Sequence, residues 1–381
     1  MTPRNLRILF LALFVWILGW GLYDDLFPIY ARGLGATPLQ LGFLFTVRQL
    51  TLTAGSVLGG ILSDRYSRRA VMLPSWFLGA PVPLLFLAAP SWAWLLPGIL
   101  LYELTIFGLP ALNAYIADRT DPERLASTFA LIMTASSLAL LIAPGLGGLI
   151  AQRWGIRTTF FLGFLCYTLS TVLIFLTEPD RRTARTALPW RQALRFWEMR
   201  GLWPVLVMLG TMTGVPIALA PFVAPFLREV RGLSLAQIGG LGSVLSAGGL
   251  LFTLAAGRAA DRWGHAPVLV STLLLIAAGT LLVAFGPVYL LPVAFLIRSR
   301  SAAQSLAQAV VGGRVTPAAA GRAFGLLGMV TGLVGAGGTL LSGLGYRTNP
   351  VLPLAAGAGV VITLATVLLV RRQTLRAPAV E

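Results

Sequence analysis

Long apolar runs, separated by short polar stretches rich in arginine, fill the sequence from end to end. A helix that crosses the roughly 30 Å core of a bilayer needs about 20 apolar residues, and twelve runs reach that length. The pattern predicts an all-α membrane protein with twelve transmembrane helices. We expect them over Leu6–Ala31, Pro38–Ser63, Ala70–Ala89, Trp92–Ala117, Leu125–Ala151, Thr158–Leu176, Leu202–Phe226, Leu235–Ala260, Pro267–Phe285, Val288–Gly313, Ala323–Leu344 and Leu352–Val370.

The composition excludes the main classes of soluble protein. Of 381 residues, 57% are hydrophobic and 11% are charged, whereas globular domains contain about 25% charged residues. The single cysteine, Cys166, permits no intramolecular disulfide, and the single histidine, His265, weakens the case for a metal centre or a Ser-His-Asp triad. The chain has no lysine, so it cannot contain a phosphate-binding Gly-x-x-x-x-Gly-Lys loop. We therefore expect no enzyme activity, no cofactor and no metal.

The formal net charge of +16 could indicate a nucleic-acid partner, but the positions of the arginines favour a membrane explanation. Sorted by predicted loop, 20 arginines fall on the face that carries both termini and 6 fall on the other face, with 3 inside spans. Arginine is retained in cytoplasmic loops of membrane proteins. We therefore expect both termini in the cytoplasm, an inner (plasma) membrane location and no nucleic-acid partner.

The two halves of the chain look like a tandem repeat. Asp64-Arg65 follows the second predicted span and Asp261-Arg262 follows the eighth, 197 residues later; residues 122–129 match residues 317–324 at an offset of 195. Such repeats indicate internally duplicated architectures. We expect a six-helix bundle over residues 1–177, a cytoplasmic linker loop over 178–200 and a second six-helix bundle over 201–381.

The loop after the second span carries a recognisable motif. Gly60-Ile-Leu-Ser-Asp64-Arg65-Tyr66-Ser67-Arg68-Arg69 resembles the Gly-x-Leu-x-Asp-Arg-x-Gly-Arg-Arg signature of the major facilitator superfamily, with Ser67 replacing the usual glycine. A degenerate copy begins at Gly257. The resemblance implies a secondary transporter that works by alternating access, and a cytoplasmic gate formed by Gly60, Asp64, Arg65, Arg68, Arg69, Gly257, Asp261 and Arg262. The alternative is that these charges only anchor the loops at lipid headgroups.

A second motif lies in the fifth predicted span. Ala143-Pro144-Gly145-Leu146-Gly147-Gly148 resembles the Gly-Pro-x-x-Gly-Gly signature associated with antiporters, with Ala143 replacing its first glycine. The resemblance implies that Pro144, Gly147 and Gly148 belong to an exporter. Glycines in membrane helices also serve close packing alone, so import remains open.

Six ionisable residues fall near the middle of predicted spans, where each costs about 2.5–3.5 kcal/mol even on lenient insertion scales. They are Asp24, Asp25, Arg48, Glu103, Arg298 and Arg300. Three acids balance three bases. In a continuous tenth helix, Arg300 would share a face with Gln304 and Gln308, and Arg298 would point about 160° away. We therefore expect Arg300 to face the substrate cavity and Arg298 to pair with Glu103, which lies at the repeat offset.

These charges support a functional hypothesis. Glu103, or one of Asp24 and Asp25, would exchange protons with the cavity, while Arg300, with Gln304 nearby, would hold a polar or anionic substrate group. The alternative is a fixed structural ion-pair network. We expect a monomeric, proton-coupled transporter whose partners are a small molecule, protons and the lipid bilayer, exporting amphipathic molecules by antiport. Symport of an organic anion, and a non-transporting sensor or lipid-handling protein with the same fold, stay open.

Overall fold

The computed structural model describes residues 2–179 and 201–370, apart from the side chains of Val57, Gly60 and Asp64 and of residues 317–320. Within these residues the chain is helical and contains no strand. Most of the expected linker over 178–200 lies outside the described residues. The helices of the first half are α1 (Pro3–Gly21), η1 (Asp24–Leu26), α2 (Phe27–Gly33), α3 (Pro38–Arg65), α4 (Arg68–Gly79), α5 (Val82–Ala88), η2 (Trp92–Trp94), α6 (Leu95–Leu104), η3 (Thr105–Phe107), α7 (Gly108–Arg119), η4 (Pro122–Arg124), α8 (Leu125–Trp154) and α9 (Ile156–Phe175).

The second half repeats this arrangement with longer unbroken helices at its start. Its elements are α11 (Trp203–Glu229), α12 (Leu235–Trp263), α13 (His265–Phe285), η6 (Val288–Leu290), α14 (Leu291–Ile297), α15 (Ser301–Gly312), α16 (Pro317–Thr348) and α17 (Leu352–Val370). Eleven helical segments among the described residues are long and apolar enough to cross a membrane. They include eleven of the twelve spans expected from the apolar runs.

The remaining expected span, Val288–Gly313, is divided between two short helices. α14 has seven residues and α15 has twelve, and Arg298, Ser299 and Arg300 separate them. The expectation of one continuous helix is therefore wrong at this place. Three consecutive polar residues, two of them charged, interrupt the apolar sequence where the backbone leaves helical geometry. With this broken span counted, the structure has the expected twelve-helix, all-α architecture.

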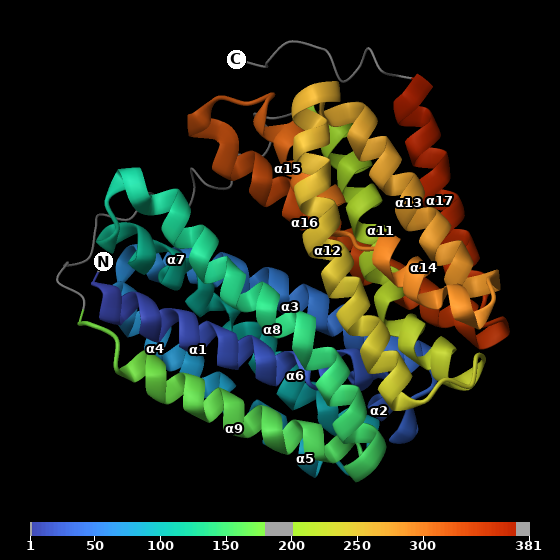
Figure 1. Ribbon diagram of the computed structural model, residues 1–381, viewed down its shortest axis with the longest axis horizontal. Coiled ribbons are helices and arrows are strands. Elements are labelled where there is room, and N and C mark those ends of the chain that lie inside the picture. The colour runs from blue at the N-terminus through green and yellow to red at the C-terminus, as the bar shows by residue number, and fades with distance from the viewer. Residues whose placement is uncertain (1, 180–200, 371–381) are drawn as a thin grey trace. The chain divides into compact units, whose positions relative to one another are not determined.

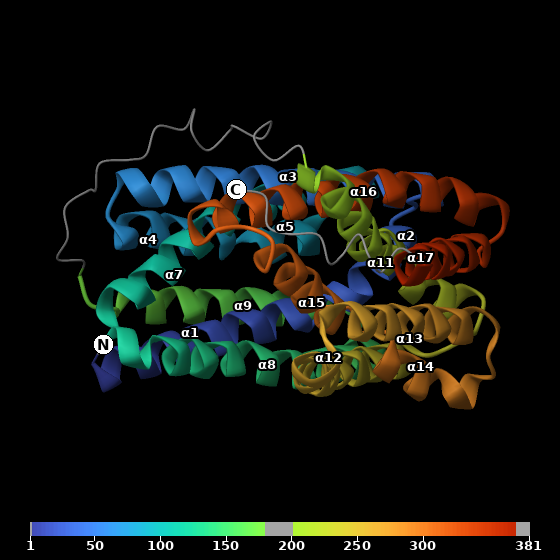
Figure 2. The ribbon, with the colours of Figure 1, turned by 90° about the horizontal axis from the view of Figure 1, so that it is seen from above.

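The chain forms two compact units. The first comprises Met1–Ala36, Val47–Trp190 and Leu233–Ser243, and the second comprises the remaining residues. In the first unit, α1 runs beside α8 and α9 (Figures 1 and 2), around a core that includes Leu9, Met72 and Tyr115. In the second unit, α11 packs against α16, and α13 packs against α17, around a core that includes Leu273 and Leu326.

The beginnings of α3 and α12 pack with elements from the other half of the sequence. Residues 37–46 belong to the second unit, where the Thr46 hydroxyl donates to the carbonyl oxygen of Ala336 in α16 at 2.7 Å. Residues 233–243 belong to the first unit, where the backbone N–H of Leu235 donates to Oε1 of Gln152 at 3.0 Å. These two helices therefore carry contacts in both units.

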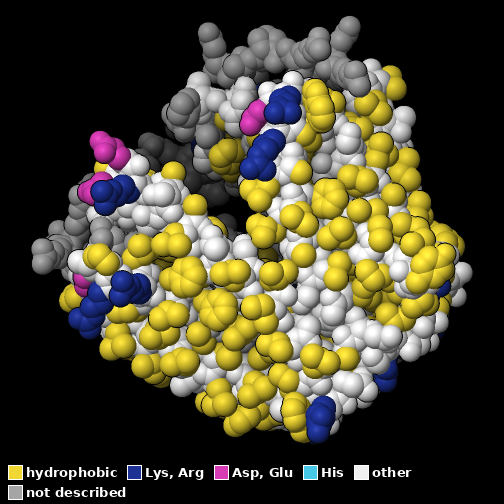
Figure 3. Space-filling model, in the orientation of Figure 1, with side chains coloured by type: hydrophobic (Ala, Val, Ile, Leu, Met, Phe, Trp, Pro, Cys, Tyr) yellow, Lys and Arg dark blue, Asp and Glu magenta, His cyan; other side chains and the backbone are white. Residues whose placement is uncertain are grey.

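The surface of the helices suits a bilayer. Many large aliphatic side chains are exposed, among them Leu149, Leu169, Leu251 and Leu341. Figure 3 shows hydrophobic side chains spread over the helices of the face in view, with arginine and acidic side chains gathered toward the helix ends. In water such a surface would be unfavourable, whereas lipid tails solvate it.

Candidate functional site

A cluster of three charged side chains lies inside the first unit. Arg48 of α3 donates from Nε to Oε1 of Glu103 at 2.6 Å and from Nη1 to Oδ1 of Asp24 at 2.8 Å. The side chains of Arg48 and Asp24 are 22% and 23% exposed, and that of Glu103 is 6% exposed. The structure thus pairs Glu103 with Arg48 of its own unit, whereas the expected pairing of Glu103 with Arg298 stays a prediction.

Both carboxylates lie where an α-helix gives way to a 3-10 turn. α1 ends at Gly21, and Asp24 begins the short 3-10 turn η1 before α2 starts. Glu103 is the penultimate residue of α6, which gives way to the 3-10 turn η3. The Ser75 hydroxyl donates to the carbonyl oxygen of Thr105 at 2.8 Å and satisfies a backbone group in that turn. Interrupted membrane helices commonly surround transporter binding sites, because non-helical backbone is tolerated where it lines a cavity.

Aromatic side chains surround the charges. A small pocket beside the cluster is lined by the three charged residues and by Trp20, Tyr23, Phe27, Phe86, Ile99 and Tyr102. The hydroxyls of Tyr23 and Tyr167 lie 2.8 Å apart, and the ring of Tyr167 stacks on Trp16 at 4.0 Å. The pocket combines flat apolar walls with charged groups in a volume of about 20 Å³. Sites for drug-sized ligands measure about 300–1,000 Å³, so an amphipathic ligand would enter only if the pocket opened further.

The sequence analysis did not identify this aromatic wall. Its signal was present in the order of residues, because Tyr23 directly precedes Asp24 and Tyr102 directly precedes Glu103. Each of the two carboxylates in the cluster thus directly follows a tyrosine. Single aromatic residues are common in membrane helices, and only the folded arrangement brings these two together with Trp20 and Phe86.

The neighbouring mid-span acid, Asp25, contacts the beginning of α12. Its Oδ2 approaches Gly242 of α12 so closely that a Cβ at Gly242 would lie 2.0 Å from it. A side chain at position 242 would also meet Pro144 of α8 at 2.9 Å. Asp25 therefore lies at the contact between α12 and the first unit, and Asp24 is the neighbour that forms an ion pair with Arg48.

The arginines of the second half flank the break between α14 and α15. Arg298 ends α14, and its guanidinium carbon lies 4.9 Å from the ring centroid of Phe295. Arg300 precedes α15 and is exposed, as are Gln304 and Gln308. The 160° separation expected from a helical wheel assumed a continuous helix, and that assumption does not hold, because the helix is interrupted between the two arginines. Arg300 and Gln304 nevertheless share an exposed polar stripe.

Two arginines of the first copy of the loop motif make polar contacts within their own unit. Nε of Arg68 lies 3.5 Å from Oδ2 of Asp118 at the end of α7, and Arg69 donates to the carbonyl oxygen of Phe175 in α9 at 2.7 Å. Arg65 is exposed. The surroundings of Gly60 and the side chain of Asp64 lie outside what the structure describes, so the expected role of Asp64 as a gate stays a prediction.

The second copy has a different turn. Gly264 takes φ +85° between α12 and α13, whereas Ser67, at the corresponding place, takes φ −62° and accepts a hydrogen bond from the backbone N–H of Ala70. Serine can therefore replace glycine in the first copy because that turn needs no positive φ and gains a helix cap. Asp261 and Arg262 are exposed, and within the described part of the chain a Cβ placed at Gly257 would meet no atom within 4 Å beyond its own helix backbone and chain neighbours.

The antiporter-like segment of α8 lies at two close helix contacts. A Cβ at Gly147 would lie 2.0 Å from the carbonyl oxygen of Leu22, and a Cβ at Gly148 would lie 2.6 Å from that of Leu235 in α12. The carbonyl oxygen of Pro144 approaches Gly239 of α12 equally closely. These glycines therefore permit α8 to contact both the end of α1 and the beginning of α12 through backbone atoms.

Comparison with known proteins places the chain among transporters. The family model of the Major Facilitator Superfamily matches residues 9–339 and 212–380. The chain is 29% identical over 164 residues to an uncharacterized MFS-type transporter of Methanocaldococcus jannaschii, a match that spans 42% of this chain and 42% of that relative. It is 28% identical over 289 residues to the multidrug resistance protein MdtG of Enterobacter lignolyticus, covering 71% of this chain and 68% of MdtG.

Solved structures share the fold. The nucleoside transporter NupG superposes with a TM-score of 0.81 at 15% identity, over 98% of this chain and 100% of NupG. The peptide transporter POT, solved in complex with sulfate, superposes with a TM-score of 0.81 at 13% identity, over 98% of this chain and 95% of POT. At such low identities the likeness shows a shared arrangement of the helices, which is the fold alone.

Proposed function

Because the chain belongs to the Major Facilitator Superfamily, we propose that it is a proton-coupled secondary transporter that exports amphipathic small molecules by alternating access. The observation that carries the proposal is the cluster in which Asp24 and Glu103 share the single guanidinium of Arg48 beside an aromatic pocket. The family membership and the integral membrane location are its premises. The proposed parts are the coupling to protons, the direction of transport and the class of substrate.

The charge count of the cluster supports proton coupling. With both carboxylates ionised, Asp24, Glu103 and Arg48 together carry one net negative charge; with one carboxylate protonated, the cluster is neutral. An uncompensated charge inside a membrane protein is costly. The cluster therefore favours the uptake of one positive charge, which either a proton or a cationic ligand can supply. Competition between the two for the same group couples proton entry to ligand release.

The walls of the pocket support an amphipathic cation as substrate. Trp20, Tyr23, Phe27, Phe86 and Tyr102 line the pocket together with the two carboxylates. Aromatic rings attract cations and also bury apolar surface, and a desolvated cation–π contact contributes about 2 kcal/mol. An anionic ligand would gain the apolar contacts but would be repelled by the net charge of the cluster.

Two further observations support export. The relatives named multidrug resistance protein MdtG cover most of the chain at 26–28% identity, and the segment Ala143–Gly148 resembles the antiporter signature. With both termini in the cytoplasm, as the distribution of arginines predicts, entry of protons from outside would drive the ligand outward. The motif copies at Arg68 and Asp261 would then lie at the cytoplasmic side, where we propose that they act as a gate.

The experiment that tests coupling uses purified protein in proteoliposomes that contain a pH-sensitive dye. A proton gradient is first imposed, and an amphipathic cation such as tetraphenylphosphonium is then added. If the cation is transported, the gradient should collapse faster in vesicles that contain the protein than in protein-free vesicles. Glu103→Gln and Asp24→Asn should each abolish this ligand-dependent proton flux, because each neutralises the cluster permanently. Glu123→Gln, an exposed acid in η4, is the matched control. If both cluster variants retain wild-type flux and pH dependence, the cluster is a fixed ion-pair network.

A second candidate function is symport of an organic anion. It is favoured by Arg298 and Arg300, which flank the helix break, and by the exposed stripe that continues through Gln304. The same vesicles distinguish it, because an anion symporter acidifies the lumen as its substrate enters, whereas an antiporter alkalinises the lumen as a cation enters. Ligand binding with no proton movement for either class would indicate a non-transporting sensor or lipid-handling protein.

A further inference from the structure

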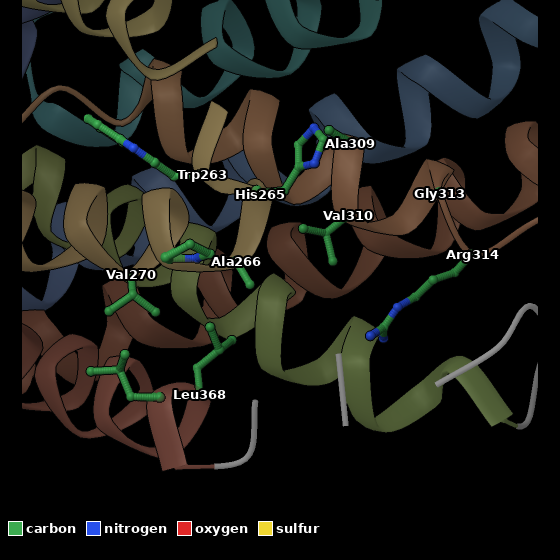
Figure 4. Close-up of a pocket in the computed structure, with 12 residues that line it drawn as sticks. Trp263, His265, Ala266, Val270, Ala309, Val310, Gly313, Arg314 and Leu368 are labelled. Atoms are coloured by element: carbon green, nitrogen blue, oxygen red, sulfur yellow. The ribbon is translucent and has the colours of Figure 1, made fainter. Parts of the chain in front are cut away.

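A cavity of about 450 Å³ lies in the second unit, at the turn of the second motif copy, and none of its lining residues belongs to the charged cluster. It forms where α12 ends at Trp263 and α13 begins at His265, next to the last turns of α15 and α17. Figure 4 draws the lining residues that these four helix ends contribute. Its volume falls in the range of small-molecule sites, about 300–1,000 Å³.

One side of the cavity is cationic. Arg314, just beyond α15, is 8% exposed, and Figure 4 shows its side chain extending from that end of the helix along the cavity. Burial lowers the pKa of Arg314, because the charged form loses hydration. A guanidinium stays protonated at neutral pH all the same. A negatively charged group in the cavity would therefore be stabilised beside it.

The start of α13 adds to this cationic side. His265 opens the helix, no side chain caps its first turn, and that turn contains no acidic residue. The N-terminal end of a helix carries partial positive charge and free backbone N–H donors. His265 and Ala266 both line the cavity, so these donors lie beside it, together with the imidazole of His265.

The other side of the cavity is aliphatic. Val270, Val310, Leu368 and Leu369 contribute hydrocarbon walls, and Trp263 at the end of α12 is 72% exposed. Tryptophan is enriched at the interface between membrane and water. Inorganic phosphate would use none of this apolar wall. A molecule that carries both a phosphate and hydrocarbon chains uses both sides of the cavity.

We propose that this cavity binds an anionic phospholipid, with its phosphate against Arg314 and the start of an acyl chain along Val270, Val310 and Leu368. The cavity lies at the helix ends that the arginine distribution assigns to the cytoplasmic leaflet, where anionic lipids supply such headgroups and basic pockets between membrane helices recognise them. The proposal is independent of the transported substrate, because the site and the charged cluster lie in different units.

Native mass spectrometry of the full-length protein in detergent tests the proposal with two lipids of equal chain length. Wild-type protein should retain dioleoyl phosphatidylglycerol at a concentration at least tenfold below that needed for dioleoyl phosphatidylcholine. Arg314→Gln should remove most of this preference. Arg347→Gln, an exposed arginine in the last turn of α16, should keep it and serves as the matched control.

A second variant keeps the test decisive if Arg314→Gln does not fold. Ala309→Phe places a ring in the cavity from an exposed position of α15 and leaves Arg314 in place, and it should also remove the preference. The proposal is overturned if the folded variants retain wild-type selectivity, or if both lipids bind equally to wild-type protein. Displacement of the bound lipid by equimolar sodium phosphate would identify a small-anion site instead and would equally overturn it.

Discussion

The Nε atom of Arg48 lies 2.6 Å from Oε1 of Glu103, and the two residues are 55 positions apart in the sequence. The same guanidinium also reaches Asp24, so one cation from α3 serves two carboxylates, one from η1 and one from α6. Removing the cation and removing a carboxylate should consequently have opposite effects on the charge of the cluster. Variants of the cation and variants of the carboxylates can therefore distinguish a structural role of the cluster from a role in proton coupling.

Replacing Arg48 with glutamine should destabilise the protein strongly. Two carboxylates would share a poorly hydrated site without a counter-charge, and breaking a buried pair by removing one partner costs about 3–5 kcal/mol. Thermal unfolding in detergent, followed by tryptophan fluorescence, measures the loss. Arg65→Gln, at an exposed position, should unfold as the wild type does. Combining Arg48→Met with Asp24→Asn and Glu103→Gln should recover most of the stability and none of the coupled transport.

Gly148→Ala should weaken the contact between α8 and α12. The added Cβ would lie 2.6 Å from the carbonyl oxygen of Leu235 and 2.9 Å from Cα of Gly239. Both are backbone atoms, so the helices themselves would have to separate, and overpacking of this kind costs about 1–3 kcal/mol. Gly240→Ala is the matched control on α12, where no atom lies within 4 Å of the new Cβ. Equal thermal stability of the two variants would contradict the packing described.

The two repeat-related turns should respond differently to alanine. Gly264 has φ +85° and ψ 156°, a region nearly reserved for glycine, so Gly264→Ala should cost about 1–3 kcal/mol of strain. Ser67→Ala should cost about 0.5–2 kcal/mol through the lost helix cap, and Ser67→Gly only a few tenths. Unfolding midpoints of the three variants check the order. A tolerated Gly264→Ala would mean that this turn can adopt negative φ.

Asn5→Leu should loosen the attachment of α1 to the end of the first half. The Asn5 side chain is buried, donates to the Tyr115 hydroxyl at 3.1 Å and accepts from the backbone N–H of Glu178 at 3.2 Å. Leucine has similar volume but leaves that N–H without this acceptor, at a cost of about 1–3 kcal/mol. Asn113→Leu, at an exposed position of α7, should be nearly neutral. Faster proteolysis near Glu178 in Asn5→Leu alone would support the prediction.

Arg48 and Glu103 show which features of the candidate site can be predicted from the sequence and which cannot. Both could be identified as mid-span charges, because hydrophobic length gives their approximate depth. Their pairing could not be predicted, since it depends on the rotation of α3 and α6 about their axes. The repeat offset pointed to Arg298 instead, because symmetry relates positions and says nothing of which helix faces approach.

The sequence by itself determined the membrane architecture: twelve apolar runs, the excess of arginine in one set of loops and the family signature with its repeat. These are local or additive properties of the chain, and each can be counted residue by residue. The tertiary structure alone decided that the backbone breaks at Arg298–Arg300, that Tyr23 and Tyr102 join the carboxylates, and that Arg314 lines a cavity. These features arise because packing, through backbone contacts such as those of Gly147 and Gly148, sets how each helix is rotated and where it can end.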